Sequence, residues 1–202
     1  MKKWILLLFV VPATCVLKAQ TGRDFDCGVK AGWSVTNISH SGLKDKMSGH
    51  LGAFAEWKIN DYFGIQPELL YSRQGAREKY KDDDGKWKHK LQINYLNIPV
   101  LAKLYVLKRL SVDLGPQLGL ALSVRNRIKG SSDDVTYIYK EKVKKFNTCD
   151  FSFALGASCS MGEFVLSARY NIGLTNVFNW MEQNNKNHVF QLSLGCCLNN
   201  LF

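Results

Sequence analysis

Residues 189–202 read VFQLSLGCCLNNLF, and they carry the strongest fold signal in the chain. Apolar residues at every second position alternate with Gln191, Ser193 and Gly195. This period of two predicts an amphipathic β-strand, because successive side chains of a strand leave on opposite faces. An amphipathic last strand that ends on Phe202 is typical of outer-membrane barrels. It predicts the barrel-assembly machinery as a partner, with Phe202 as the residue recognised.

The same alternation recurs along the rest of the chain and gives eight predicted strands in all. Short connections at 60–61, 107–109 and 161–162 separate long ones at 38–48, 77–90, 126–149 and 176–187. An even strand number with short turns at one rim predicts a closed eight-stranded antiparallel transmembrane β-barrel, with short periplasmic turns and long extracellular loops. The predicted strands are 25–37, 49–60, 62–74, 91–106, 110–125, 150–161, 163–175 and 188–201.

The first residues have the order of a secretory signal peptide. Lys2 and Lys3 precede an apolar run at 4–16, and a small residue, Ala19, follows. The run is shorter than the roughly 20 residues that a spanning helix needs. We therefore expect a signal peptide at 1–19 and a barrel domain at 20–202. A lipoprotein signal ending at Cys15 is the alternative, and Thr14 is a poor residue to precede its acylated cysteine.

Charge and cysteine content limit the possible partners. The chain has 27 basic and 17 acidic residues, so removal of Lys2, Lys3 and Lys18 leaves a charge of +7. The basic residues are spread over strands and loops, which argues against nucleic acid and favours anionic lipid headgroups or glycans at the cell surface. The five cysteines after Cys15 fit no zinc spacing, and we expect no metal or cofactor.

Glycines indicate which face of each strand meets lipid. A soluble lipocalin-like barrel and a membrane barrel both alternate, but the glycines fall in the polar phase of the strands. Glycine on a water-exposed face brings no benefit, whereas in a narrow lumen it makes room for long side chains. The polar face is therefore predicted to line the lumen. The lipid-facing phase contains no charge and includes Trp33, Leu51, Trp57, Ile65, Leu118, Leu155, Leu166 and Ile172.

Charged residues of both signs lie in the predicted lumen phase. We expect Lys30, Lys103 and Arg169 to pair with Glu56, Glu68 and Asp113 across the barrel, because side chains fill so narrow an interior. Such a network predicts a plugged lumen rather than a channel. Other residues predicted to line the lumen include His50, Lys58, Gln66, Gln117, Arg125 and Asn171.

Three prolines fall within predicted strands. Pro67, Pro99 and Pro116 each remove a donor from a sheet that has no edge, so we expect bulges there. Pro99 is the best candidate, because the apolar phase moves from Leu91, Ile93 and Tyr95 to the even-numbered residues just before it.

Several segments resemble the small outer-membrane proteins labelled "outer membrane protein beta-barrel domain" or "porin family protein". The resemblance covers nearly all of the chain after the leader. It implies the closed barrel of a Gram-negative-type outer membrane, strand prolines, and no established activity. The segments are GVKAG at 28–32, GIQPELLYS at 64–72, INYLNIPV at 93–100, DLGP at 113–116 and ARYNIGL at 168–174.

A structural or surface-interaction role is the function that these features favour, with the loops as the interacting parts. The basic connection at 126–149 could bind lipopolysaccharide phosphate or an acidic glycan, or it could be only solvated charge. Asp82–Gly85 could hold calcium or form a plain turn. A small-solute porin, a lipid-modifying enzyme and a periplasmic carrier are the alternatives. The enzyme would need a triad, and His50 is the one histidine within a strand body, without a Gly-x-Ser-x-Gly motif.

Overall fold

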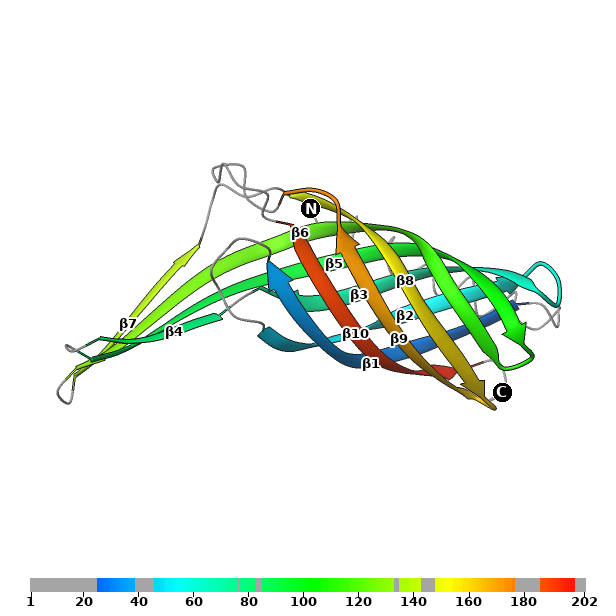
Figure 1. Cartoon of the computed structure of the whole chain (residues 1–202), viewed down its shortest axis with the longest axis horizontal. Coiled ribbons are helices and arrows are strands. Elements are labelled where there is room, and N and C mark those ends of the chain that lie inside the picture. Colours follow the sequence, from blue (N-terminus) through cyan, green and yellow to red (C-terminus); the bar gives the residue numbers. More distant parts are fainter. Residues whose placement is uncertain are drawn as a thin grey trace, which may run out of the picture.

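The computed structural model describes residues 25–38, 46–75, 77–82, 85–132, 135–142, 148–176 and 186–198. Eight of the strands in these ranges form a closed antiparallel ring in the order β5-β3-β2-β1-β10-β9-β8-β6, which the pairing of β5 with β6 completes. The predicted eight-stranded barrel is confirmed (Figure 1). The ring strands are β1 (Phe25–Ile38), β2 (Lys46–Lys58), β3 (Phe63–Gln74), β5 (Gly85–Leu107), β6 (Leu110–Ser132), β8 (Cys149–Met161), β9 (Phe164–Gly173) and β10 (Asn187–Cys197).

One end of the barrel carries the short turns. The connections after β2, β5 and β8 are tight, and Gly162 adopts the left-handed φ of 65° that lets β8 turn back into β9. The start of β1 and the end of β10 lie at the same end, where Gly28 pairs with Cys197. Among the residues described, no helix is long and apolar enough to cross a membrane.

The opposite end differs from the prediction. Two connections expected to be long loops, 77–90 and 126–149, are largely strand: β4 (Arg77–Asp82) pairs with the beginning of β5, and β7 (Val135–Lys142) pairs with the end of β6. Together these segments form a four-stranded sheet, which we call the arm: β4, residues 85–92 of β5, residues 125–132 of β6, and β7. Figure 1 shows the arm projecting beyond the barrel on the side where β4 and β7 are labelled.

A bulge lies in β6 where the barrel becomes the arm. Asn94 pairs with Ser123 and Tyr95 with Ala121, so Leu122 is an extra residue without an opposite partner. A single extra residue exchanges the two faces of a strand beyond it. Odd-numbered residues of β6 are buried up to Ala121, but Arg125 is exposed. The prediction that Arg125 lines the lumen is therefore wrong.

The strand prolines do not cause bulges. Pro67 pairs with Val100, and the pairs on either side of it keep one register, as do the pairs around Pro99. Ile93 and Tyr95 are only 1% exposed and lie in the same inward phase as Lys103. The expected change of phase at Pro99 is therefore wrong: the alternation of buried and more exposed residues in β5 is unbroken from Gln92 to Leu104, and apolar residues enter the lumen at its arm end.

The two faces of the barrel wall otherwise follow the prediction. Outward residues such as Trp33 (63% exposed) and Leu155 (50% exposed) give an apolar outer surface, while polar residues line the interior. Inward glycines are required mainly by the neighbouring strand. A Cβ at Gly52 would lie 2.0 Å from the Leu69 carbonyl oxygen, and one at Gly115 would lie 2.1 Å from that of Val100. Glycine therefore allows the tight wall of a narrow barrel.

Candidate functional site

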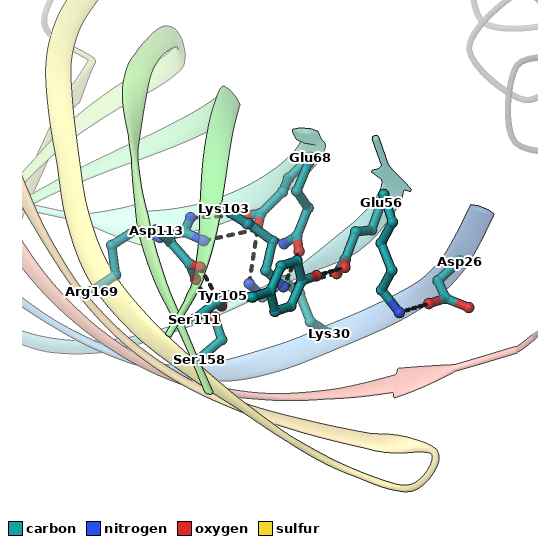
Figure 2. A network of polar contacts seen from close by, with 12 residues as sticks. Asp26, Lys30, Glu56, Glu68, Lys103, Tyr105, Ser111, Asp113, Ser158 and Arg169 are labelled. Atoms are coloured by element: carbon teal, nitrogen blue, oxygen red, sulfur yellow. Dashed lines mark hydrogen bonds and ion pairs between the residues drawn. The ribbon is translucent and has the colours of Figure 1, made fainter. Parts of the chain in front are cut away.

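Glu68 is the centre of a buried cluster in the lumen (Figure 2). Its side chain on β3 is fully buried and receives a hydrogen bond of 3.0 Å from Lys30 Nζ on β1. Arg169 on β9 reaches it from across the barrel with two bonds, Nη1 to Oε2 at 2.9 Å and Nη2 to Oε1 at 2.8 Å. Paired donors from guanidinium to carboxylate are a strong, orientation-specific contact. One carboxylate therefore joins two cations from different walls of the lumen.

A second cluster lies nearer the short turns. Lys103 Nζ contacts Glu56 Oε2 at 2.8 Å and the Gln66 side-chain oxygen at 2.9 Å, with the Lys103 side chain only 1% exposed. The Tyr105 hydroxyl donates to the other oxygen of Glu56. Gln66 Nε2 also donates to Glu68 Oε1 at 2.5 Å. Gln66 therefore connects the two clusters into one network.

Asp113 is placed differently from the expectation. It is opposite Lys103 in the pairing of β5 with β6, but Lys103 extends to Glu56 instead. The hydroxyls of Ser111, at 2.7 Å, and of Ser158 donate to the two oxygens of Asp113. Of the six residues predicted for the network, the structure brings five into ion pairs and holds the sixth, Asp113, by hydroxyl groups.

His50 lies between two serines in the lumen. Its Nδ1 is 2.8 Å from Ser34 Oγ, and its Nε2 is 2.7 Å from Ser193 Oγ. A hydrolytic triad needs a carboxylate to orient the histidine. In the described ranges the hydrogen-bond partners of His50 include none, and no group of three or more His, Cys, Asp or Glu residues there could hold a metal ion. The two serine hydroxyls hold His50 in place as a lumen side chain.

The arm end of the lumen has a separate layer that the sequence analysis missed. Asn187 donates to Gln74 Oε1 at 2.5 Å and contacts Asp150 at 3.4 Å, and Thr175 donates to Asp150 at 2.8 Å. Lys46 donates to the Gln74 carbonyl at 2.8 Å. Apolar side chains close the same level. They are Ile93, Tyr95, Val124 and Val189, each 2% exposed or less.

Some predicted features lie outside the described residues. These include Asp83 and Asp84 of the calcium candidate, Cys15 and Phe202. The five described cysteines, Cys27, Cys149, Cys159, Cys196 and Cys197, are free thiols.

Comparisons with known proteins give one matching family and several similar solved structures. A family model described as "outer membrane protein beta-barrel domain" matches residues 18–179. A comparison with curated proteins finds no match. Solved structures similar to this chain include Ail, the attachment invasion locus protein of Yersinia pestis, at 13% identity over 86% of this chain and 99% of Ail, with a TM-score of 0.46. Neisserial surface protein A has 13% identity over 85% of this chain and 96% of its own, with a TM-score of 0.49. OprG of Pseudomonas aeruginosa has 12% identity over 88% of this chain and 98% of its own, with a TM-score of 0.43.

Proposed function

Because this chain belongs to the outer membrane protein beta-barrel domain family and is an outer-membrane protein of a Gram-negative-type bacterium, we propose that it is a non-conducting barrel that anchors the arm at the cell surface. In this orientation the short turns face the periplasm and the arm faces outward, as the long connections of such barrels do. The role is one of structure and surface interaction, and the proposal assigns no reaction to the chain.

The observation that carries the proposal is the bridge of Lys30, Glu68 and Arg169 across the lumen. These side chains are at most 5% exposed, and they come from strands on different walls. The cluster around Lys103 fills the level nearer the periplasm, and the layer with Ile93 and Tyr95 fills the level nearer the arm. An eight-stranded barrel has an interior just wide enough for its own side chains, so these three levels leave little room for a solute path.

The competing function is a small-solute porin. Planar-bilayer recordings of the mature protein separate the two. We expect a flat baseline without steady single-channel steps, because moving an ion along the lumen would require the ion pairs of Glu68 and Lys103 to open together. Steady, voltage-independent steps from the purified protein would reject the plugged lumen and favour the porin.

Presentation of the arm has its own test. Intact cells would be treated with protease, and the cut sites would be mapped by mass spectrometry. The connections between β4 and β5 and between β6 and β7 should be cut from outside, while the short turns after β2 and β8 should be cut only in lysed cells. The reverse pattern would place the arm in the periplasm.

A further inference from the structure

Lysine and arginine are gathered on one face of the arm by the strand register. Arg77 on β4 is opposite Lys90 on β5, which is opposite Arg127 on β6, which is opposite Lys140 on β7. Directly opposed residues share a face, and so do residues two apart along a strand. Eleven positions of this cationic face are therefore basic: Arg77, Lys79, Lys81, Lys86, Lys88, Lys90, Arg125, Arg127, Lys129, Lys140 and Lys142.

The opposite face of the arm has the complementary composition. Its positions include every carboxylate residue of the four arm segments, Glu78, Asp82 and Glu141, and no lysine or arginine. Aromatic residues occupy one row of it, where Tyr80 is opposite Trp87 and Gly130 is opposite Tyr137. Charge that served only to keep the arm soluble would mix both signs on both faces. The separation by sign gives the cationic face the composition that suits an anionic partner.

The rows of like charge are costly without such a partner. Lys79, Lys88 and Lys129 form a second row of directly opposed cations, beside the row of Arg77. Like charges opposite one another in a sheet are destabilising. Among the arm positions that the structure describes, the cationic face contains no acidic residue to offset them. An anion that binds several of these positions at once would remove the repulsion.

The bulge at Leu122 is what brings the charges together. On the barrel side of the bulge, odd-numbered residues of β5 are opposite odd-numbered residues of β6. On the arm side, the even-numbered lysines of β5 are opposite odd-numbered residues of β6, as in the pair of Lys88 and Lys129. Without the extra residue, Arg125, Arg127 and Lys129 would occupy the same face as Trp87. The bulge thus places the basic residues of the two central strands on a single surface.

The position of the cationic face identifies the source of the anion. Val100 on β5 and Leu122 on β6 are exposed on the outer wall, and Arg125, also exposed, continues that wall into the arm. The face that contacts acyl chains within the membrane is therefore the face that becomes cationic beyond it. The groups beside a barrel wall just outside the hydrocarbon are the headgroups of the neighbouring outer-leaflet lipids.

We propose that the cationic face of the arm binds the phosphate and carboxylate groups of lipopolysaccharide molecules that lie beside the barrel. This inference rests on the proposed function, because it requires the arm to be outside the cell. The basic rows run from the row of Lys86 to the row of Gln92, in which Arg125 and Lys142 are the basic residues, and at about 3.4 Å per residue they span about 20 Å. That height matches an anion whose charges are distributed along a lipid and its sugars, rather than a single phosphate.

The test measures binding of purified rough-type lipopolysaccharide to the full-length mature protein in phosphatidylcholine nanodiscs. A row variant carries Arg77→Gln, Lys90→Gln, Arg127→Gln and Lys140→Gln. A matched control neutralises the other face with Glu78→Gln, Asp82→Asn and Glu141→Gln. The row variant relieves repulsion, so it should fold at least as well as the unaltered protein, and the shift in gel mobility on heating checks this for both.

We expect the unaltered protein to bind lipopolysaccharide with an affinity that decreases steeply with salt, and the control to bind at least as tightly. The row variant should bind at least about tenfold more weakly, since each cation near an anionic lipid surface contributes to attraction. Hydrogen exchange of β4 and β7 should slow on binding. Equal affinity of the row variant and the control would overturn the inference.

A second probe, soluble heparin, separates this inference from the proposed function. Binding of heparin without binding of purified lipopolysaccharide would overturn the lipid assignment and leave a surface-interaction barrel intact. Steady conductance by the unaltered protein would remove the proposed function, whatever either probe shows.

Discussion

Replacement of Glu68 by glutamine tests the lumen network most sharply. Glutamine has nearly the same shape, but it removes the charge that Lys30 and Arg169 share at 2.8 to 3.0 Å. The two cations would then remain almost fully buried, with side-chain exposures of 5% and 4%. Removing one partner of a buried pair costs about 3–5 kcal/mol, and two cations lose theirs here, so we expect the upper part of that range.

The matched control is Asp26→Asn, which removes the pair of Asp26 with Lys58 near the short turns. That pair also spans 3.0 Å, but its side chains are 29% and 41% exposed. Exposed pairs contribute about 0–1 kcal/mol, so this variant should unfold almost like the unaltered protein. Unfolding in urea, in lipid vesicles and followed by tryptophan fluorescence, gives the free energy of each variant.

A triple variant shows whether charge or volume is responsible. Lys30→Met, Glu68→Leu and Arg169→Met together leave no buried charge in this cluster, and apolar replacement of a whole ion-pair group is often neutral or stabilising. The triple variant should therefore be more stable than Glu68→Gln alone. The reasoning is refuted if Glu68→Gln loses less than about 1 kcal/mol, as the exposed control does.

Three further changes have defined outcomes. Lys103→Met leaves the Glu56 carboxylate buried without its cation, so urea unfolding should show a loss of about 3–5 kcal/mol, and no loss would argue against that ion pair. Gly52→Ala should lower the urea midpoint clearly, because the added Cβ would lie 2.0 Å from a backbone oxygen. Gly49→Ala should not, because the nearest atom to its added Cβ is 3.6 Å away, and equal midpoints would contradict the close approach of the strands at Gly52. Deletion of Leu122 should weaken lipopolysaccharide binding in nanodiscs while the barrel still shifts in gel mobility on heating, because the basic residues of β6 and β7 would leave the face. Unchanged affinity would mean that the bulge does not set the cationic face.

The barrel could be predicted because its signal is local and repeated. Apolar and polar residues alternate with period two from Phe25 onward, and the alternating segments give the strand number. Closure follows because lipid offers no hydrogen-bond partners to the edge of an open sheet. The inward phase of the glycines was also readable. The physical reason for these glycines was only partly predictable, since a Cβ at Gly52 would collide with the backbone of the next strand rather than with a long side chain.

The arm was missed because its alternation is one of charge rather than apolarity. Lys86, Lys88 and Lys90 alternate with Trp87 and His89, and this pattern has the period of a strand. A search restricted to apolar alternation ends each strand where the membrane ends. Alternation of charge with neutral residues would have extended the predicted strands into the two long connections.

The partners within the lumen could not be read from the sequence. Opposite charges on neighbouring strands, such as Lys103 and Asp113, predict a pair, but the long lysine side chain reaches Glu56 on another strand. Likewise, nothing in the composition near Leu122 marks the extra residue of the bulge. Both depend on which strands face each other across a closed barrel, which is a property of the whole fold.

The contact of the outer wall with lipid is the claim on which the remaining interpretation depends. Trp33, 63% exposed on that wall, provides a direct probe in a variant that retains it as the single tryptophan. In vesicles whose acyl chains carry bromine, its fluorescence should be strongly quenched, while aqueous iodide should have little effect. Quenching by iodide without quenching by the brominated chains would show that the apolar wall does not face the membrane.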